Sequence, residues 1–451
     1  MVHQFKNNGY DIVLDVNSGA IHVVDDVTYD VIAMYEEHTK EEILAALSDK
    51  YSEAEIREAM DEVEQLRENE ELFTEDVYEN HIIDFKKRPT VVKALCLHIA
   101  HDCNLACKYC FAEEGEYHGR RALMSYETGK QALDFLIANS GNRRNLEVDF
   151  FGGEPLLNFD VVKQLVAYGR EQEKLHDKHV RFTLTTNGVL LNDDLMVFAN
   201  KEMDNVVLSI DGRKEVHDHM RPFRKGAGSY DLIVPKFQKL ADSRNQERYY
   251  VRGTFTHYNT DFSKDVLHLA DLGFKQISVE PVVAQPTDDY ALTEEDLPVL
   301  FEEYDKLAAE MVRRNKEGNA FNFFHFMIDL EGGPCVYKRL SGCGSGTEYL
   351  AVTPWGDLYP CHQFVGNEDF LMGNVWDGIK RNDIQDEFKC CNVYAKEKCR
   401  NCFARFYCSG GCAANSYNFH GSITDAYDLG CELQKKRIEC AIMIKAAEAE
   451  N

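Results

Sequence analysis

The sequence predicts an α/β protein built around a sheet of parallel strands. Between residues 94 and 290, short apolar runs alternate with helical stretches six times. Such βα repeats form an open or barrel-like parallel sheet, because each helix returns the chain to the same end of the sheet. Two further observations complete the fold class. A hairpin pattern followed by helices opens the chain, and a region rich in cysteine and glycine begins at residue 335.

The first predicted domain spans residues 1–85. Residues 10–24, YDIVLDVNSGAIHVV, alternate in character around Asn-Ser-Gly, which is the pattern of a β-hairpin. Helical patterns then cover residues 26–37, 39–50 and 52–69. The last of these opens with Ser52 and Glu55, the residues of a capping box. A hairpin with three helices in so short a segment predicts a winged-helix-like domain.

The remaining boundaries follow the changes of pattern along the chain. A polar linker at 86–93 leads into the βα repeats at 94–290, a helical bridge at 291–334, the Cys-rich region at 335–440 and the end of a C-terminal helix at 441–451. The predicted strands are 94–100, 146–151, 182–186, 206–210, 249–256 and 277–282, and the predicted helices among them are 125–140, 158–176, 192–202, 228–242 and 261–272. Ligands of such folds bind at the carboxyl ends of the strands. The segments AHDCNL, FGGEP, TTNG and SIDG all fall there.

Charge and hydropathy limit the possible partners. The chain has 451 residues and a net charge of −27, so nucleic acid and anionic membranes are unsuitable partners. Residues 1–85 hold 23 acidic and 5 basic residues, a net charge of −18, which suits either a basic partner or a merely solvated acidic surface. The sequence has no apolar run long enough for a transmembrane helix and no signal-peptide pattern at its start, so we expect a cytoplasmic protein.

The fifteen cysteines are therefore expected to be reduced and to ligate metal rather than form disulfides. The segment CNLACKYC places Cys103, Cys107 and Cys110 on the loop after the first strand of the sheet. Three thiolates bind three irons of a [4Fe–4S] cube and leave the fourth iron open to a small molecule. A zinc site is the alternative, with His98 or His101 as its fourth ligand.

This motif resembles the signature of radical S-adenosyl-L-methionine (SAM) enzymes, with Tyr109 as the aromatic residue before the third cysteine. The resemblance implies a partial (β/α)6 barrel over residues 94–290, in which the open iron binds the amino and carboxylate groups of SAM. Cleavage of SAM then gives a 5′-deoxyadenosyl radical. Cys103, Cys107 and Cys110 are the catalytic cluster ligands on this interpretation.

Other strand ends resemble the SAM contacts of the same family. Gly152 and Gly153 of GGEP permit a close approach of the backbone, and Glu154 can accept a hydrogen bond from the SAM ammonium. Ser209 and Asp211 of SIDG match the segment that contacts the ribose.

Two more positions complete the expected SAM site. Asn187 of TTNG ends a strand that faces the same site. An arginine meets the SAM carboxylate in this family, and both Arg221 and Arg252 are candidates.

The C-terminal cysteines follow a second pattern. Their spacing, C-x12-G-x4-C, then C-x2-C-x5-C-x3-C, then a final C, resembles the SPASM extension of radical SAM enzymes that modify peptides and proteins. The resemblance implies two auxiliary [4Fe–4S] clusters, and three clusters in all. It assigns Cys343, Cys361 and Cys412 to the first auxiliary cluster and Cys399, Cys402, Cys408 and Cys431 to the second. Taken alone, residues 399–412 also fit a zinc ribbon.

Seven cysteines are one short of the eight that two fully ligated clusters need. The eighth ligand is either Cys335 or absent, and an open iron would hold a substrate thiolate. The cysteines with no place in the pattern are predicted to be ordinary thiols. They are Cys96, Cys390, Cys391 and Cys440.

The domain order as a whole resembles the maturases of ribosomally made peptides, and closely resembles the thioether (sactionine) maturases of the six-cysteines-in-forty-five-residues peptides. The resemblance implies a Cys-rich precursor peptide whose leader adds as a strand to the N-terminal domain. It also implies a bond between a Cys thiol and the α-carbon of an acceptor, a Thr in that family. An electron donor such as flavodoxin or ferredoxin would supply the electrons.

Two other functions remain open from the sequence. A formylglycine-forming maturase of the anaerobic sulfatase type shares the clusters, but in that family an Asp follows the cysteine that corresponds to Cys361, and His362 stands here. A non-enzymatic iron–sulfur regulator would explain the winged-helix pattern and the clusters. It would not explain GGEP or the six βα units, and the acidic N-terminal domain is unsuited to DNA.

Overall fold

The computed structural model describes residues 1–79, 87, 89–117, 119–330 and 335–449. Its central sheet confirms the predicted α/β class, because six strands run parallel in the order β10-β9-β8-β7-β6-β4. These strands are β4 (Ala94–His101), β6 (Asn145–Gly152), β7 (His179–Thr186), β8 (Asn205–Ser209), β9 (Tyr249–Phe255) and β10 (Gln276–Pro281).

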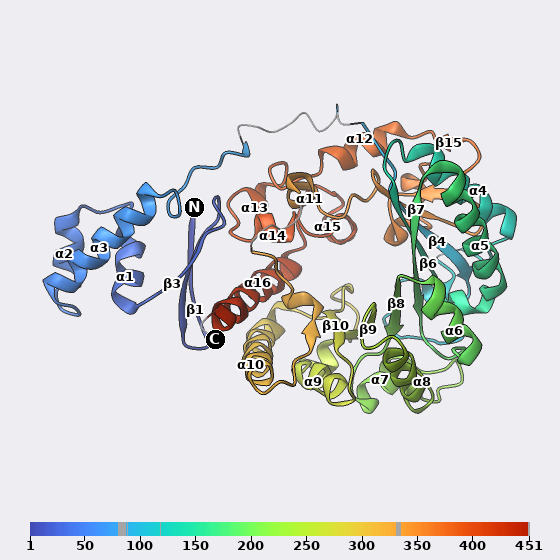
Figure 1. Cartoon of the computed structure of the whole chain (residues 1–451), viewed down its shortest axis with the longest axis horizontal. Helices are drawn as coiled ribbons and strands as arrows, with labels where there is room; N and C mark the ends of the chain where they lie inside the picture. The colour runs from blue at the N-terminus through green and yellow to red at the C-terminus, as the bar shows by residue number, and fades with distance from the viewer. Residues whose placement is uncertain (80–86, 88, 118, 331–334, 450–451) are drawn as a thin grey trace.

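Helices cover the outer face of this sheet (Figure 1). Strands β6 and β7 alternate: Phe150 and Phe182 are buried beneath the helices, whereas the neighbouring Asp149 and Thr183 face the other side. Strand β4 is buried at all eight of its positions. The inner face therefore carries polar side chains at β6 and β7. The covering helices are α4 (Tyr126–Asn139), α5 (Phe159–His176), α6 (Asp193–Glu202), α8 (Tyr230–Ser243) and α9 (Ser263–Asp271), and the short helix α7 (Lys214–Met220) was not predicted.

The Cys-rich region continues the same sheet, which the sequence did not predict. Strand β12 (Tyr349–Val352) pairs with β4 in parallel, and β13 (Asp357–Tyr359), β14 (Gly373–Asn374) and β15 (Gly378–Ile379) follow antiparallel. At the opposite edge β11 (Asn322–Phe323) pairs with β10. The short strand β5 (Ala122–Leu123) pairs with the end of β4, inside the sheet. Strand β4, which precedes the cysteines at 103–110, and strand β12, which precedes Cys361, are therefore neighbours joined by backbone hydrogen bonds.

Helices make up most of the remaining C-terminal half. Helix α10 (Leu297–Lys316) lies in the predicted bridge and packs beside α16 (Asp428–Ala449). The boundary predicted at residue 440 falls inside α16. Parts of the predicted linker and bridge, residues 86, 88 and 331–334, lie outside the described residues. The short helices are α11 (Val336–Ser341), α12 (Asn382–Cys390), α13 (Glu397–Arg400), α14 (Arg405–Cys408) and α15 (Ala413–His420).

The N-terminal domain has the predicted hairpin and three helices, with one strand more. Strands β1 (Val2–Asn7), β2 (Tyr10–Asp15) and β3 (Ile21–Val24) form an antiparallel sheet in that order. Helices α1 (Asp26–Met34), α2 (Lys40–Leu47) and α3 (Glu53–Glu68) follow, and the capping box of Ser52 and Glu55 is present. The end of this domain as predicted, at residue 85, lies outside the described residues.

The small sheet is packed on both faces. Val13 belongs to the core under α1–α3, whereas Ile12 and Leu14 belong to the main core of the molecule. The sheet therefore lies between its own helices and α16, as Figure 1 shows.

Buried polar contacts fix the same interface. Arg405 donates hydrogen bonds to Asp76 at 2.8 Å and to Asn17 at 2.7 Å, and the Tyr394 hydroxyl donates to Asp76 at 2.9 Å. The N-terminal sheet is thus held against the segment that contains the last cysteines. Within the described residues, none of the helices combines the length and apolar character that a membrane crossing requires.

Candidate functional site: three groups of cysteines

The first group of cysteines lies directly after β4. Cys103, Cys107 and Cys110 are half-buried, and each is close enough for its charge to act on at least one of the others. Backbone hydrogen bonds hold their loop to the end of α7 and the residues after it, from Ala106 N–H to the Pro222 carbonyl and from Lys108 N–H to the Met220 carbonyl, both at 2.9 Å. The loop is therefore fixed without relying on the thiols.

Burial dominates the chemistry of these thiols. It raises the pKa of Cys103 to about 12 and the pKa of Cys107 to about 11. Both stay protonated at neutral pH until a metal displaces the protons. Among the described residues, no group of three His, Cys, Asp or Glu side chains meets the geometry of a single metal ion. Thiolates on a four-iron cube bind different irons and therefore stand apart.

GGEP brings β6 against the cluster loop. A Cβ atom on Gly152 would lie 2.4 Å from the Ala100 carbonyl oxygen, and one on Gly153 would lie 2.2 Å from that of Asp102. Gly152 also has a φ of +115°, which favours glycine. The expected close approach exists, and in the described residues it is made to backbone: Gly153 N–H donates to the Ala100 carbonyl at 2.7 Å.

Glu154 joins the ends of two neighbouring strands, β6 and β7. Its fully buried carboxylate accepts hydrogen bonds from the Thr186 hydroxyl and from Asn187 N–H at 2.8 Å, and from Leu156 N–H at 3.0 Å. Burial raises the pKa of this carboxyl, and the hydrogen bonds oppose the rise. The contacts hold GGEP and TTNG together at the carboxyl edge.

Asn187 reaches the cysteine loop itself. Its amide donates to the Asn104 side-chain oxygen at 2.7 Å, and its Nδ2 atom lies 3.6 Å from Cys103 Sγ. The predicted position of TTNG beside the first cysteine group is therefore observed.

Tyr109, Asp211 and Arg221 form a buried triad under the cysteines. The Tyr109 hydroxyl donates to the Asp211 carboxylate at 2.7 Å and accepts from Arg221 Nη1 at 2.8 Å. Burial raises the pKa of Asp211 to about 6, and the charge of Arg221 opposes the rise. Arg221 Nε is buried and has no hydrogen-bond partner in the described part of the chain.

The second candidate arginine has different surroundings. Arg252, on β9, pairs with Glu280 on the neighbouring β10, with 2.6 Å between Arg252 Nε and the carboxylate, and half of its side chain is exposed. It stands beside Ser209 in the sheet register, and its charge helps to lower the pKa of His362 to about 4, after burial. Arg252 and Ser209 therefore share the inner face of the barrel.

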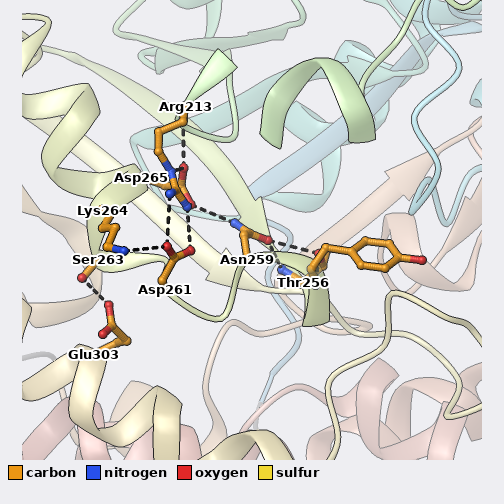
Figure 2. A network of polar contacts seen from close by, with 9 residues as sticks. Arg213, Thr256, Asn259, Asp261, Ser263, Lys264, Asp265 and Glu303 are labelled. Carbon is orange, nitrogen blue, oxygen red and sulfur yellow. Dashed lines mark hydrogen bonds and ion pairs between the residues drawn. The ribbon is translucent and has the colours of Figure 1, made fainter. Parts of the chain in front are cut away.

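A polar network, not predicted from the sequence, supports the loop of Asp211 (Figure 2). Arg213 donates to the fully buried Asp265 at 2.8 Å and to Asp261 at 2.6 Å, and Asn259 donates to Asp265 at 2.9 Å. A Cβ atom on Gly212 would lie 2.3 Å from Cβ of Asp265, so only glycine allows this packing. The network fixes the SIDG end against the start of α9.

The C-terminal cysteines gather into two further groups. Cys361 interacts electrostatically with Cys412 and Cys343. A separate group is linked by the same kind of interaction: Cys399 with Cys402 and Cys408, and Cys431 with Cys399 and Cys402. Both groups contain the cysteines of the predicted ligand sets, but Cys391, which belongs to neither set, interacts with Cys343 of one group and Cys399 of the other.

The cysteines left over differ from one another. Cys335 is exposed at the start of α11. Cys391 is buried and interacts electrostatically with Cys343. Both cysteines line a cavity of about 50 Å³. The sequence predicts an ordinary thiol for Cys391, because its position does not match the cysteine spacing of the SPASM pattern.

Comparisons with known proteins agree with this geometry. Residues 92–234 match the family of 4Fe-4S single cluster domains. TigE, a radical SAM cyclopropyl synthase of Paramaledivibacter caminithermalis, is 23% identical over 76% of this chain and 72% of its own length. A cysteine-type anaerobic sulfatase-maturating enzyme of Clostridium novyi is 24% identical over 75% of this chain and 92% of its own length.

Solved structures show the same fold. Native anSMEcpe with bound AdoMet has a TM-score of 0.64 at 19% identity, over 79% of this chain and 99% of its own. Streptococcus suis SuiB bound to its precursor peptide SuiA has a TM-score of 0.52 at 15% identity, over 95% of this chain and 98% of its own. A share of 95% is too large to leave out residues 1–79, so the likeness in fold includes the N-terminal domain.

Proposed function

We propose that this chain is a radical SAM/SPASM-type maturase and forms an intramolecular thioether in a ribosomally made precursor peptide. The bond would join a cysteine thiol to the α-carbon of an acceptor residue, with Thr as the first choice. The observation that carries the proposal is the arrangement of cysteines in sets of three, three and four, the first of which follows β4 at the carboxyl edge of the sheet.

The cysteine sets fit three [4Fe–4S] clusters. Cys103, Cys107 and Cys110 would hold the SAM-binding cluster, Cys343, Cys361 and Cys412 the first auxiliary cluster, and Cys399, Cys402, Cys408 and Cys431 the second. The chemistry that SAM and the clusters supply when bound is removal of one hydrogen atom from a carbon, deprotonation of the thiol, and acceptance of the electron left as the carbon–sulfur bond forms.

The protein's own residues would orient SAM. Arg221 offers a buried, unpartnered Nε–H to the SAM carboxylate, and Glu154 has acceptor capacity left for the ammonium. Ser209 and Asp211 would bind the ribose from the neighbouring strand end. Arg252, already paired with Glu280, would instead face the peptide in the barrel.

Mass spectrometry of the product tests the proposal. Incubation of the reduced protein and SAM with a Cys-containing precursor should remove two hydrogens for each crosslink, and the cysteine should become resistant to thiol alkylation. Formylglycine would contradict the proposal because that product lacks the sulfur. Loss of two hydrogens with the thiol still alkylated would contradict it as well, because the oxidation would then have formed no carbon–sulfur bond.

The leader of the precursor would bind the outer edge of β3. In the described residues β3 pairs only with β2, so its other side is free to receive a strand. The side chain of Val23 is 48% exposed on this strand. The acidic charge of the domain would favour a basic leader.

Replacing Val23 with Asp should raise KM for a leader-bearing peptide about 10-fold, since interface contacts of this kind contribute about 1–2 kcal/mol. SAM cleavage without peptide should not change. Val197→Asp, the same change at an exposed valine on α6, is the matched control. Equal KM values for the two variants would contradict leader binding at β3. A point change is preferable to deletion of residues 1–85, which would uncover the core around Ile12 and Leu14.

The first auxiliary cluster is expected to lack a fourth protein ligand. Cys335→Ala should therefore leave the electron paramagnetic resonance (EPR) spectrum of the reduced, peptide-free protein unchanged. Peptide should perturb that spectrum only when its acceptor cysteine is present. Cys343→Ala is the positive control and should remove one cluster. A cluster lost or altered in Cys335→Ala without peptide would identify Cys335 as a ligand and contradict the open site.

A further inference from the structure

We infer that Lys396 is a buried counter-charge shared by the two auxiliary clusters, and that it sets their reduction potentials. It is a positioning residue, because it would act through the cluster ligands without touching the substrate. The inference rests on the proposed function in requiring both auxiliary clusters.

The ammonium of Lys396 has an unusual environment. The residue is 2% exposed. Its Nζ donates to the carbonyl oxygens of Gly410 and Asp425 at 2.9 Å and to the Ser416 hydroxyl at 3.3 Å. All three acceptors are neutral. No carboxylate of the described residues lies within ion-pair distance of this nitrogen, whereas the neighbouring Lys398 is paired with acidic side chains at the surface.

Lys396 lies between the two C-terminal cysteine groups. Its charge acts on Cys399, a member of the group of four, and on Cys412, a member of the group of three. It acts on Cys391 as well, and Lys396 lines the same cavity as Cys343. The cation therefore faces both proposed cluster sites.

The turn at 408–412 explains how one lysine reaches both groups. This turn carries Cys408, of the group of four, and Cys412, of the group of three. Lys396 binds the carbonyl of Gly410 at the middle of the turn, and the backbone N–H groups of Gly410 and Gly411 point to the Cys408 thiol. The lysine stem packs beside Gly410, with Cδ 3.6 Å from where a Cβ atom on this glycine would stand.

Burial of an ammonium among neutral oxygens alone is unfavourable, so an anionic partner is missing from the protein atoms. Iron–sulfur clusters held by thiolates are anionic, and the two ligand groups flank the ammonium. In a medium of low dielectric constant, a nearby cation stabilises the more negative, reduced form of each cluster. Lys396 should therefore raise both reduction potentials and ease the transfer of the released electron.

The test is an EPR-monitored redox titration of the full-length, anaerobically reconstituted protein. Lys396→Met should lower the midpoint potentials of both auxiliary clusters, while the SAM-sensitive signal of the reactive cluster stays in place. Lys396→Arg keeps the charge and should titrate close to the unmodified protein. Lys398→Met removes an exposed charge from the same segment, paired with Asp428, and should shift neither potential because water screens it.

Unchanged potentials in Lys396→Met, or a shift of only one cluster, would overturn the inference. If Lys396→Met fails to retain the auxiliary clusters, Lys396→Arg decides. Retention of both clusters in that variant supports a role for charge, and their loss contradicts it. An unmodified protein without auxiliary signals would instead refute the proposed function, so the two failures are distinguishable.

Discussion

Replacing Cys103, Cys107 and Cys110 together with alanine is expected to abolish SAM cleavage and leave the auxiliary iron in place. These thiols are the proposed anchors of the reactive cluster, and the loop that carries them is held by backbone bonds to Pro222 and Met220. The fold around it should therefore survive. Iron should fall from about twelve to about eight atoms per chain, at four per cluster.

Iron analysis and chromatography of 5′-deoxyadenosine measure this effect. Cys390→Ala is the matched control, since Cys390 is half-buried and belongs to none of the three groups. It should retain all the iron and full SAM cleavage. Continued formation of 5′-deoxyadenosine by the triple variant would show that the reactive site lies elsewhere.

Arg221→Met should weaken SAM binding about 10- to 100-fold, whereas Arg252→Met should change it little. A hydrogen bond to a charged group contributes about 1.5–3 kcal/mol, and about 1.4 kcal/mol corresponds to a tenfold change in Kd. Arg221 lies in the buried triad with a free Nε–H, while Arg252 is already paired with Glu280. Calorimetric titration with SAM compares the two variants.

A measurement of unfolding stability separates the structural effect of losing Arg221 from its effect on SAM binding. Loss of Arg221 leaves the buried Asp211 carboxylate without its cation, which costs about 3–5 kcal/mol of unfolding free energy when such a pair is broken. Urea unfolding should therefore show a lower midpoint for Arg221→Met than for Arg252→Met. Weaker SAM binding in Arg252→Met than in Arg221→Met would reverse the assignment of the SAM carboxylate.

The barrel could be predicted because its signals are local. Strands such as β6 and β7 alternate between a helix-covered face and a polar face, and the Ser52 capping box marks the start of α3 within four residues. The cysteine groups were predictable for a different reason. Their spacing carries the pattern of a family, which the grouping of Cys361 with Cys343 and Cys412 then matches.

The features that were missed depend on long-range contacts. Strand β1 shows only a weak alternation of apolar and polar residues. Strand β12 is too short to be recognised from the sequence without its partner β4. Arg213 meets Asp265 across 52 residues of sequence. Lys396 stands in the polar segment AKEKC, where it looks like any surface lysine until the fold buries it.

Deuterium transfer tests the central claim most directly. A precursor peptide deuterated at the α-carbon of its acceptor residue is incubated with the reduced protein and SAM, and the 5′-deoxyadenosine is analysed by mass spectrometry. Thioether formation at that carbon predicts one deuterium in 5′-deoxyadenosine for each crosslink. Crosslinked peptide that retains its deuterium, or 5′-deoxyadenosine that contains none, would contradict the account.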